Sequence, residues 1–255
     1  GTSALDAERL HEDAPRLPIR GVANGVDTDA FAPAPGPGDD GLLVFTGTMH
    51  YHPNEQAAAH FVEQVLPLIR ERVPHARFVG AGGKVPPGLE RLRNEHVEFT
   101  GYVDSMDEWF ARAAVLVVPL LVGGGTRFKV VEGLSCQRPV VSTRLGAEGL
   151  DVTHDRDVLL ADEPQAFADA VVELLLDRAR ADALAATGRR TVEERYAWRV
   201  LGQHFEAALC EAVDRRAAGS GFGVPEGFGL PGTGPADAAS SPDERPSAPH
   251  TEPQR

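Results

Sequence analysis

The sequence predicts an α/β protein built on one doubly wound parallel sheet, with further helices after the last strand. Short apolar runs recur between about residues 41 and 161, helical patterns separate them, and glycine-containing turns follow several of the runs. Near-continuous apolar runs are typical of parallel strands that are covered on both faces. Their alternation with helices indicates βαβ units.

Six apolar runs are candidate strands. Most of them lack the strict alternation of a strand with one wet face, so we expect helices on both sides of the sheet. The runs cover residues 42–45, 76–79, 97–99, 115–118, 139–142 and 158–160.

Helical patterns fill the gaps between these runs and continue after the last one. The first begins after Asn54 and carries an apolar stripe that includes Phe61 and Ile69; Pro67 is expected to kink it or end it early. The pair Glu163-Pro164 predicts the start of another helix, because proline is favoured in a first helical turn. The remaining predicted helices cover residues 106–114, 129–137, 178–195 and 198–216.

Composition limits the class of protein. With 255 residues and 42% hydrophobic residues the chain can bury a large core, and its net charge of -13 argues against general nucleic-acid binding. The longest apolar run, around residues 113–122, is interrupted by Pro119 and is shorter than the roughly 20 residues of a membrane-spanning helix. Two cysteines, Cys136 and Cys210, favour a reduced compartment and predict a cytoplasmic protein.

The composition changes sharply near the C-terminus. Residues 217–255 hold seven Pro and seven Gly, with five acidic residues against two arginines. This content predicts a disordered tail. A binding role for its large apolar residues is an alternative that the sequence leaves open.

The strongest functional signal follows the run 115–118. Gly123, Gly124 and Gly125 lead through Thr126 and Arg127 into a helix that carries Lys129 and Glu132. A glycine loop that opens onto a helix N-terminus at the carboxyl end of a strand is a common place for anionic ligands. Residues three apart share a helix face. One side chain can therefore face a phosphate while the carboxylate accepts both hydroxyls of a ribose; a solvated Lys129–Glu132 pair is the plainer alternative.

Three other turns follow candidate strands. Gly47 and Thr48 come after the first strand, where a glycine lets the backbone approach a phosphate closely. The loop 80–84 could add a cation. After the third strand, Tyr102 or Val103 could lie against the face of a base. An ordinary turn is the alternative for each of them and is the favoured interpretation of the loop 80–84. No histidine spacing predicts a metal site.

In this order and spacing, these motifs resemble the C-terminal, donor-binding half of nucleotide-sugar-dependent group 1 glycosyltransferases with the GT-B fold, which has two Rossmann-like domains. The match covers about residues 15–205. It includes Asn24-Gly25-Val26-Asp27, Phe45-Thr46-Gly47-Thr48, Pro53-Asn54, Gly101-Tyr102-Val103-Asp104, the stretch 123–134, residues 139–143 and 146–150, and Tyr196-Ala197-Trp198.

The resemblance implies a nucleoside diphosphate sugar as donor. Its diphosphate would lie near Gly47, Thr48 and the Arg127–Lys129 segment, and its ribose on Glu132. The base would lie near Tyr102 and Val103, and Gly124, Gly125 and Thr126 would contact the donor. Arg127, Lys129 and Glu132 are the implied catalytic residues. Many relatives carry a sugar-contacting glutamate where this chain has Gly124. Relatives of this type retain the anomeric configuration and need no metal ion or other cofactor.

The resemblance also implies a partner domain. Residues 1–40 look like a connector from an N-terminal acceptor domain, followed by a Rossmann-like donor-binding domain at 41–216. The first residue is Gly1 rather than Met, so we expect that an upstream segment has been removed. The acceptor is an unknown hydroxyl compound. A sugar-nucleotide epimerase of the same architecture and a non-catalytic nucleotide-sugar-binding module are the competing hypotheses.

Overall fold

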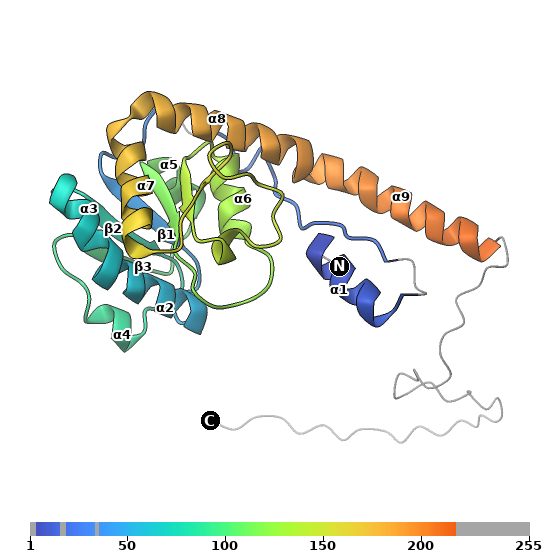
Figure 1. The fold of residues 1–255 in the computed structure, drawn as a ribbon, viewed down its shortest axis with the longest axis horizontal. Coiled ribbons are helices and arrows are strands. Elements are labelled where there is room, and N and C mark those ends of the chain that lie inside the picture. Colours follow the sequence, from blue (N-terminus) through green and yellow to red (C-terminus); the bar gives the residue numbers. More distant parts are fainter. Residues whose placement is uncertain (1–3, 16–18, 34–35, 218–255) are drawn as a thin grey trace, which may run out of the picture. The chain divides into compact units, whose positions relative to one another are not determined.

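One six-stranded parallel sheet forms the centre of the computed structural model (Figure 1). Its strand order is β3-β2-β1-β4-β5-β6, and each neighbouring pair runs parallel. Every strand coincides with a predicted apolar run, so the predicted fold class is confirmed. The strands are β1 (Leu42–Thr46), β2 (Arg77–Ala81), β3 (Val97–Gly101), β4 (Val115–Val118), β5 (Val140–Ser142) and β6 (Leu159–Leu160).

The structure describes residues 4–15, 19–33 and 36–217. The chain divides into two compact units, residues 1–211 and 212–255. Apart from Ala217, the predicted tail at 217–255 lies outside the described residues. The predicted domain limits at residues 40 and 216 stay predictions. Within the described ranges, no helix is long and apolar enough to cross a membrane.

The predicted helices are all present, and their ends differ from the predicted ones by two residues or fewer where both ends were predicted. Two helices, α1 and α4, and the short 3-10 helix η2 were not predicted. The helical elements are α1 (Ala4–Asp13), α2 (His52–His60), η1 (Phe61–Val65), α3 (Leu66–Arg72), α4 (Pro87–Glu90), α5 (Asp107–Arg112), α6 (Phe128–Ser135), η2 (Leu145–Ala147), α7 (Pro164–Leu176), α8 (Arg178–Arg195) and α9 (Trp198–Ala217).

Pro67 interrupts the first long helix without ending it. The segment runs from α2 through the π-helical turn η1 into α3, with Pro67 in the first turn of α3. The N–H of Leu66 donates to the carbonyl of Phe61, five residues earlier. Proline has no N–H and its ring crowds the preceding turn. A single wider turn before it accommodates both effects, which is a common use of π-helical geometry.

Helices cover both faces of the sheet (Figure 1). The connections β1–β2 and β4–β5 leave the centre in opposite directions, so right-handed crossovers place their helices on opposite faces. On one face η1 and α3 contact α7; on the other, α6 packs on β4 and β5, and α8 packs on α6.

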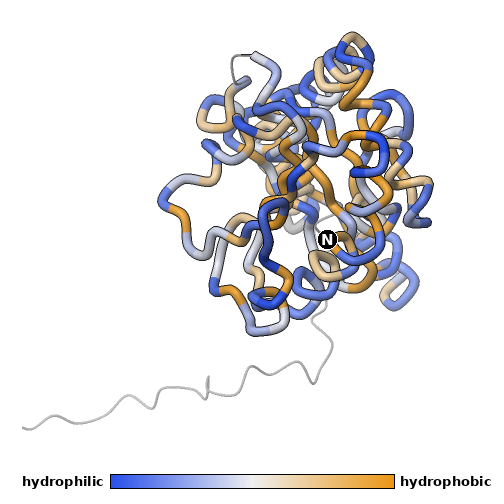
Figure 2. Tube along the Cα trace, turned by 90° about the vertical axis from the view of Figure 1, so that its left-hand side faces the viewer, coloured by the Kyte–Doolittle hydropathy of each residue, from blue (hydrophilic) through white to orange (hydrophobic). Residues whose placement is uncertain are grey.

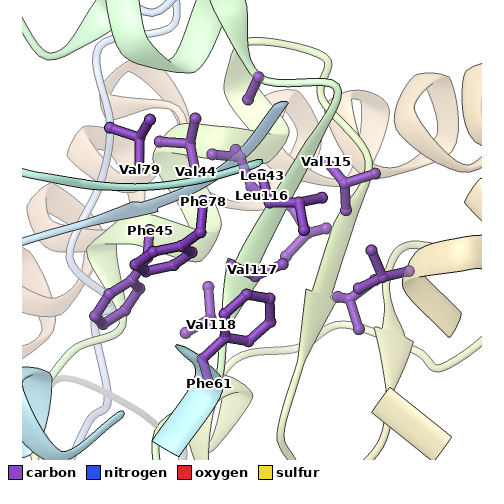
Figure 3. Packing of buried hydrophobic residues seen from close by; sticks show 14 of the residues in the cluster. Leu43, Val44, Phe45, Phe61, Phe78, Val79, Val115, Leu116, Val117 and Val118 are labelled. Carbon is purple, nitrogen blue, oxygen red and sulfur yellow. The ribbon is translucent and has the colours of Figure 1, made fainter. Parts of the chain in front are cut away.

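The core lies between these layers, and Figure 2 shows hydrophobic segments concentrated in the interior of the molecule. Phe61 of η1 packs on Phe78 of β2 with ring centroids 5.0 Å apart, and meets Phe167 of α7 edge-on at 5.9 Å. Figure 3 shows Phe61 with the buried side chains of β1, β2 and β4. These aromatic contacts join the sheet to two helices of one face.

On the other face, α6 lies unusually close to β4. A Cβ at Gly133 would come within 2.2 Å of the Leu116 Cδ1 atom and 3.6 Å of Val140 Cγ2. Only a residue without a side chain lets the helix approach the strand this closely. The close approach fixes the height above the sheet of the helix that carries Lys129 and Glu132.

We therefore predict that Gly133→Ala destabilises the protein. Alanine favours a helix over glycine by about 1 kcal/mol, but overpacking a core costs about 1 to 3 kcal/mol. The buried Leu116 is only 2% exposed and has little room to move, so we expect the steric cost to exceed the gain. The free energy of unfolding, measured by urea titration, should fall by about 1 to 2 kcal/mol.

Gly202 in α9 is the matched control, because a Cβ there meets nothing within 4 Å. Gly202→Ala should leave stability unchanged or raise it by up to about 1 kcal/mol. Equal effects at the two positions would contradict the packing that we describe for α6.

Candidate functional site

The candidate site lies at the carboxyl edge of the sheet, where the loops after β1 and β4 meet. The strand order reverses between these two neighbours, and the crevice at such a point is the usual ligand site of an open α/β sheet. The β1 loop carries Gly47 and Thr48, and the β4 loop carries the three glycines before α6. Gly123 lies against α2 as well, since a Cβ there would be 3.1 Å from the Pro53 side chain.

Gly47 leaves room for two polar side chains. Its φ is +146°, and a Cβ at this position would lie 2.8 Å from Asn54 Nδ2 and 3.1 Å from Lys129 Nζ. The amide and the ammonium therefore both reach the backbone of the β1 loop. The structure thus brings the predicted residues Gly47 and Lys129 together.

Lys129 is held by contacts from two other elements. Its Nζ donates to Asn54 Oδ1 at 2.7 Å and lies 4.2 Å from the centroid of the Phe45 ring. Asn54 Nδ2 in turn donates to the carbonyl of Thr48 at 3.0 Å. Asn54 is 7% exposed. The buried amide fixes both the ammonium and the loop that contains Thr48.

Burial also changes the protonation of this lysine. The pKa of Lys129 is lowered to about 7: desolvation is the largest cause, the positive charge of Arg127 acts in the same direction, and Glu132 partly opposes both effects. A phosphate placed near the ammonium would favour its charged form. The lysine is therefore poised to gain its proton when an anion binds.

Glu132 is half-buried one turn further along α6. Its carboxylate has no hydrogen bond and no ion pair to any residue that the structure describes. The simple Lys129–Glu132 ion pair is thus not formed, because Lys129 bonds to Asn54 instead. Burial raises the pKa of Glu132, and the charge of Lys129 acts in the opposite direction. An acceptor that is half-buried and has no protein partner is suited to the hydroxyls of a ligand.

Arg127 is buried, and its guanidinium bonds to the backbone of its own loop and of η2. Only 5% of it is exposed, and its guanidinium donates to the carbonyls of Leu145, Gly124 and Gly123, each at 3.0 Å. A carboxylate oxygen of Glu148 lies 3.7 Å from Nη2. These bonds restrain the backbone of the glycine loop from its buried side. A direct contact between Arg127 and a phosphate stays a prediction.

The tip of the glycine loop is open. Gly124 and Gly125 are exposed, and a Cβ at either would meet nothing within 4 Å. Thr126 is half-buried and accepts a hydrogen bond from Asn24 Nδ2 at 2.6 Å. These residues line a cavity of about 90 Å³ together with Asn24 and Arg127.

Tyr102 and Val103 lie further away, after β3, two strands from β1. Gly101 there has a φ of +72°; Tyr102 is 80% exposed and Val103 is half-buried. The β2 loop spans the gap, since Gly82 N donates to Thr100 Oγ1 at 3.2 Å and the Gly82 carbonyl accepts from Met49 N at 3.3 Å. Hydrogen bonds thus connect the β1 loop to the β2 loop and the β2 loop to the end of β3. The structure does not place Tyr102 against Lys129 or Glu132.

Sequence reasoning missed the roles of Asn54, Phe45 and Asn24. Asn54 was predicted only as a helix start, although a buried amide directly after Pro53 is a signal that it bonds elsewhere. Among the residues described, no group of three or more His, Cys, Asp or Glu side chains could hold a metal ion.

Comparison with known proteins adds independent information. The family model "Glycosyl transferases group 1" matches residues 40–177. A GDP-mannose-dependent alpha-(1-6)-phosphatidylinositol monomannoside mannosyltransferase from Mycobacterium tuberculosis (strain ATCC 25618 / H37Rv) is 31% identical over 213 residues, covering 73% of this chain and 54% of the relative. The protein of the same name from Mycolicibacterium smegmatis is 27% identical over 232 residues, covering 80% and 59%. The chain thus spans little more than half the length of these relatives.

Solved structures show the same fold. Anabaena Alr3699/HepE, crystallised with UDP and glucose, superposes with a TM-score of 0.68 at 14% identity, covering 82% of this chain and 62% of that one. The C-terminal domain of the glycosyl transferase group 1 family protein LpcC from Francisella tularensis has a TM-score of 0.56 at 20% identity, covering 68% of this chain and all of that one. At these identities the likeness concerns the fold alone.

The family match covers more than half of the chain, and it includes both loops of the candidate site, after β1 and after β4. This chain belongs to the group 1 glycosyl transferases.

Proposed function

We propose that the chain is the donor-binding half of a glycosyltransferase that moves a sugar from a nucleoside diphosphate sugar to a hydroxyl group, with retention of configuration. The observation that carries the proposal is the pairing on α6 of a held ammonium, Lys129, with a carboxylate that has no partner among the described residues, Glu132. The two lie three residues apart, beside a loop of glycines. A cation suits a diphosphate, and a carboxylate acceptor suits the hydroxyls of a ribose.

Lys129 and the glycine loop would hold the diphosphate. In the proposed reaction the bond between the sugar C1 and the diphosphate oxygen breaks, a bond from C1 to the acceptor oxygen forms, and the proton of the acceptor hydroxyl passes to the leaving diphosphate. Negative charge grows on the leaving diphosphate. A buried ammonium stabilises that charge more strongly than a solvated one would.

Glu132 would hold the ribose, and Tyr102 and Val103 would lie near the base. Arg127 would act by keeping the loop in shape, with its positive charge adding to the potential around the phosphates. Gly124 and Gly125, exposed and free of close neighbours, would face the donor.

We propose GDP-mannose as the donor. Support comes from the two mycobacterial relatives, whose names specify GDP-mannose and which align over most of this chain. The HepE structure contains UDP, so UDP sugars are the alternative donors to test. The acceptor site would come from a second, N-terminal domain, because the relatives are nearly twice as long as their matched part. We place the reaction in the cytoplasm, in keeping with the free thiols of Cys136 and Cys210.

The first prediction concerns Glu132. Glu132→Ala should weaken GDP binding by about 10- to 100-fold, because hydrogen bonds to a charged group are worth about 1.5 to 3 kcal/mol. Isothermal titration calorimetry with GDP and 2′-deoxy-GDP tests whether the lost affinity comes from a contact with the ribose hydroxyl. The wild-type chain should discriminate against the deoxy ligand, and the Glu132→Ala variant should bind both ligands alike.

Glu63→Ala, which removes an exposed carboxylate on η1, is the matched control and should bind GDP as the wild type does. If the Glu132→Ala variant still preferred GDP over 2′-deoxy-GDP as strongly as the wild type does, Glu132 would not be the group that binds the ribose. If the wild-type chain binds neither GDP, UDP nor their sugars, the proposed function itself is wrong.

The second prediction concerns pH. Because the pKa of Lys129 is about 7, its ammonium is charged below that pH and loses its proton above it. Both phosphates of GDP-mannose are diesters and stay anionic from pH 6 to 9, so the ligand charge is constant. Affinity for GDP-mannose should therefore be highest below pH 7 and fall by up to about tenfold per pH unit above it.

Lys129→Arg keeps a charge that does not titrate in this range, and Lys129→Met removes it. Both variants should show a flat profile, the second at much lower affinity. A pH-independent wild-type affinity would show that Lys129 does not contact the phosphates.

A further inference from the structure

Residues 24–31, called the strap below, run across the protein outside the sheet. Its backbone is bonded to the turn between α8 and α9: Val26 N donates to the carbonyl of Tyr196 at 2.8 Å, and Trp198 N donates to the carbonyl of Val26 at 3.2 Å. Gly25 lies directly under the Trp198 ring, since a Cβ there would be 2.8 Å from two ring atoms. Both sides of the strap backbone are therefore fixed at this point.

The far end of the strap is bonded to the end of α6. The carbonyl of Phe31 accepts from Ser135 Oγ at 2.8 Å and from Arg189 Nη1 at 2.9 Å. Arg189 Nη2 also donates to the carbonyl of Thr28 at 3.1 Å. Ser135 is the last residue of α6. The strap thus holds the C-terminus of the helix that carries Lys129 and Glu132.

The near end of the strap is bonded to the loop before the same helix. Asn24 Nδ2 donates to Thr126 Oγ1 at 2.6 Å. The loop offers no side chain for packing at its tip: Gly123 and Gly125 have φ values of +116° and +86°, and a Cβ at Gly124 would meet nothing within 4 Å. Glycines lose more conformational entropy on ordering than other residues do. The Arg127 bonds hold the carbonyls of Gly123 and Gly124, and Asn24 holds the other side of the tip.

We propose that Asn24 is a positioning residue of the donor site, which acts through Thr126 to hold the loop amides of residues 124–126 in the arrangement that receives the diphosphate. The ligand in this inference rests on the proposed function. The strap is anchored at the α8–α9 turn and at α6, so Asn24 supplies a fixed point against which the glycine loop is held. Its amide does not need to touch the donor.

A double-mutant cycle tests the inference by calorimetry with GDP and UDP. Asn24→Ala and Thr126→Val should each weaken binding of the nucleotide that the wild type binds, by about tenfold, since each removes one hydrogen bond that orders the loop. The double variant should lose no more than either single variant. Thr126→Ser keeps the hydroxyl and should weaken binding less than Thr126→Val does.

Two further measurements separate positioning from other roles. The free nucleosides guanosine and uridine lack phosphates, so their affinity should not change in any variant. Asn94→Ala is the matched control, because the Asn94 side chain also makes hydrogen bonds, in its case with the backbone of a turn before β3. It should leave nucleotide binding unchanged. Additive losses in the cycle, or wild-type binding by Asn24→Ala, would overturn the inference.

Hydrogen exchange keeps the test independent of the ligand. Peptides spanning residues 121–128 should exchange faster in Asn24→Ala than in the wild type, while peptides from β4 and α8 should not change. If the wild-type chain binds no nucleotide, the proposed function fails, and exchange alone decides whether Asn24 orders the loop. Unchanged exchange in that segment would show that it does not.

Discussion

The hydrogen bond from Lys129 to Asn54 is the interaction around which the candidate site is arranged. It joins α6 to α2 across the crevice between β4 and β1, two elements that are 75 residues apart in the chain. Burying an ammonium is costly unless its donors are satisfied. The Asn54 amide and the face of the Phe45 ring offset part of that cost, and Gly47 makes room for them. Parallel strands make the arrangement possible, because their carboxyl ends all lie at one edge.

The three charged side chains at the start of α6 differ in their bonding partners. Lys129 is engaged by protein groups, whereas Glu132 has no partner among the described residues and Arg127 is occupied by backbone carbonyls. An internal Lys129–Glu132 pair would have neutralised both groups and left little for a ligand. Because Lys129 bonds to Asn54 and not to Glu132, the cation and the carboxylate acceptor are both available to a ligand. The site therefore contains charged groups that the protein itself does not neutralise, as expected of a ligand-binding site.

Local pattern in the sequence was enough for the fold. Apolar runs marked all six strands, and helical spacing placed Lys129 and Glu132 on one face of α6. Contacts between distant segments could not be predicted in this way. No periodicity connects Asn54 with Lys129, and nothing local reveals that Arg127 turns back onto its own loop rather than outward. Pro67 was correctly identified as a disturbance, but the choice between ending the helix and widening one turn depended on the packing of Phe61 against Phe78 and Phe167.

The missing side chain at Gly133 has a consequence for how such a site can change. With the helix seated directly on Leu116 of β4, α6 has no freedom to rise from the sheet or to slide along it without opening a gap in the core. One wall of the site is therefore rigid. At the opposite wall, a Cβ at Gly124 would meet nothing within 4 Å, whereas Gly125 has a φ of +86° that favours glycine. Under the proposed function, a change of donor sugar would be accommodated at Gly124, while Lys129 and Glu132 stay at a constant height above the strands.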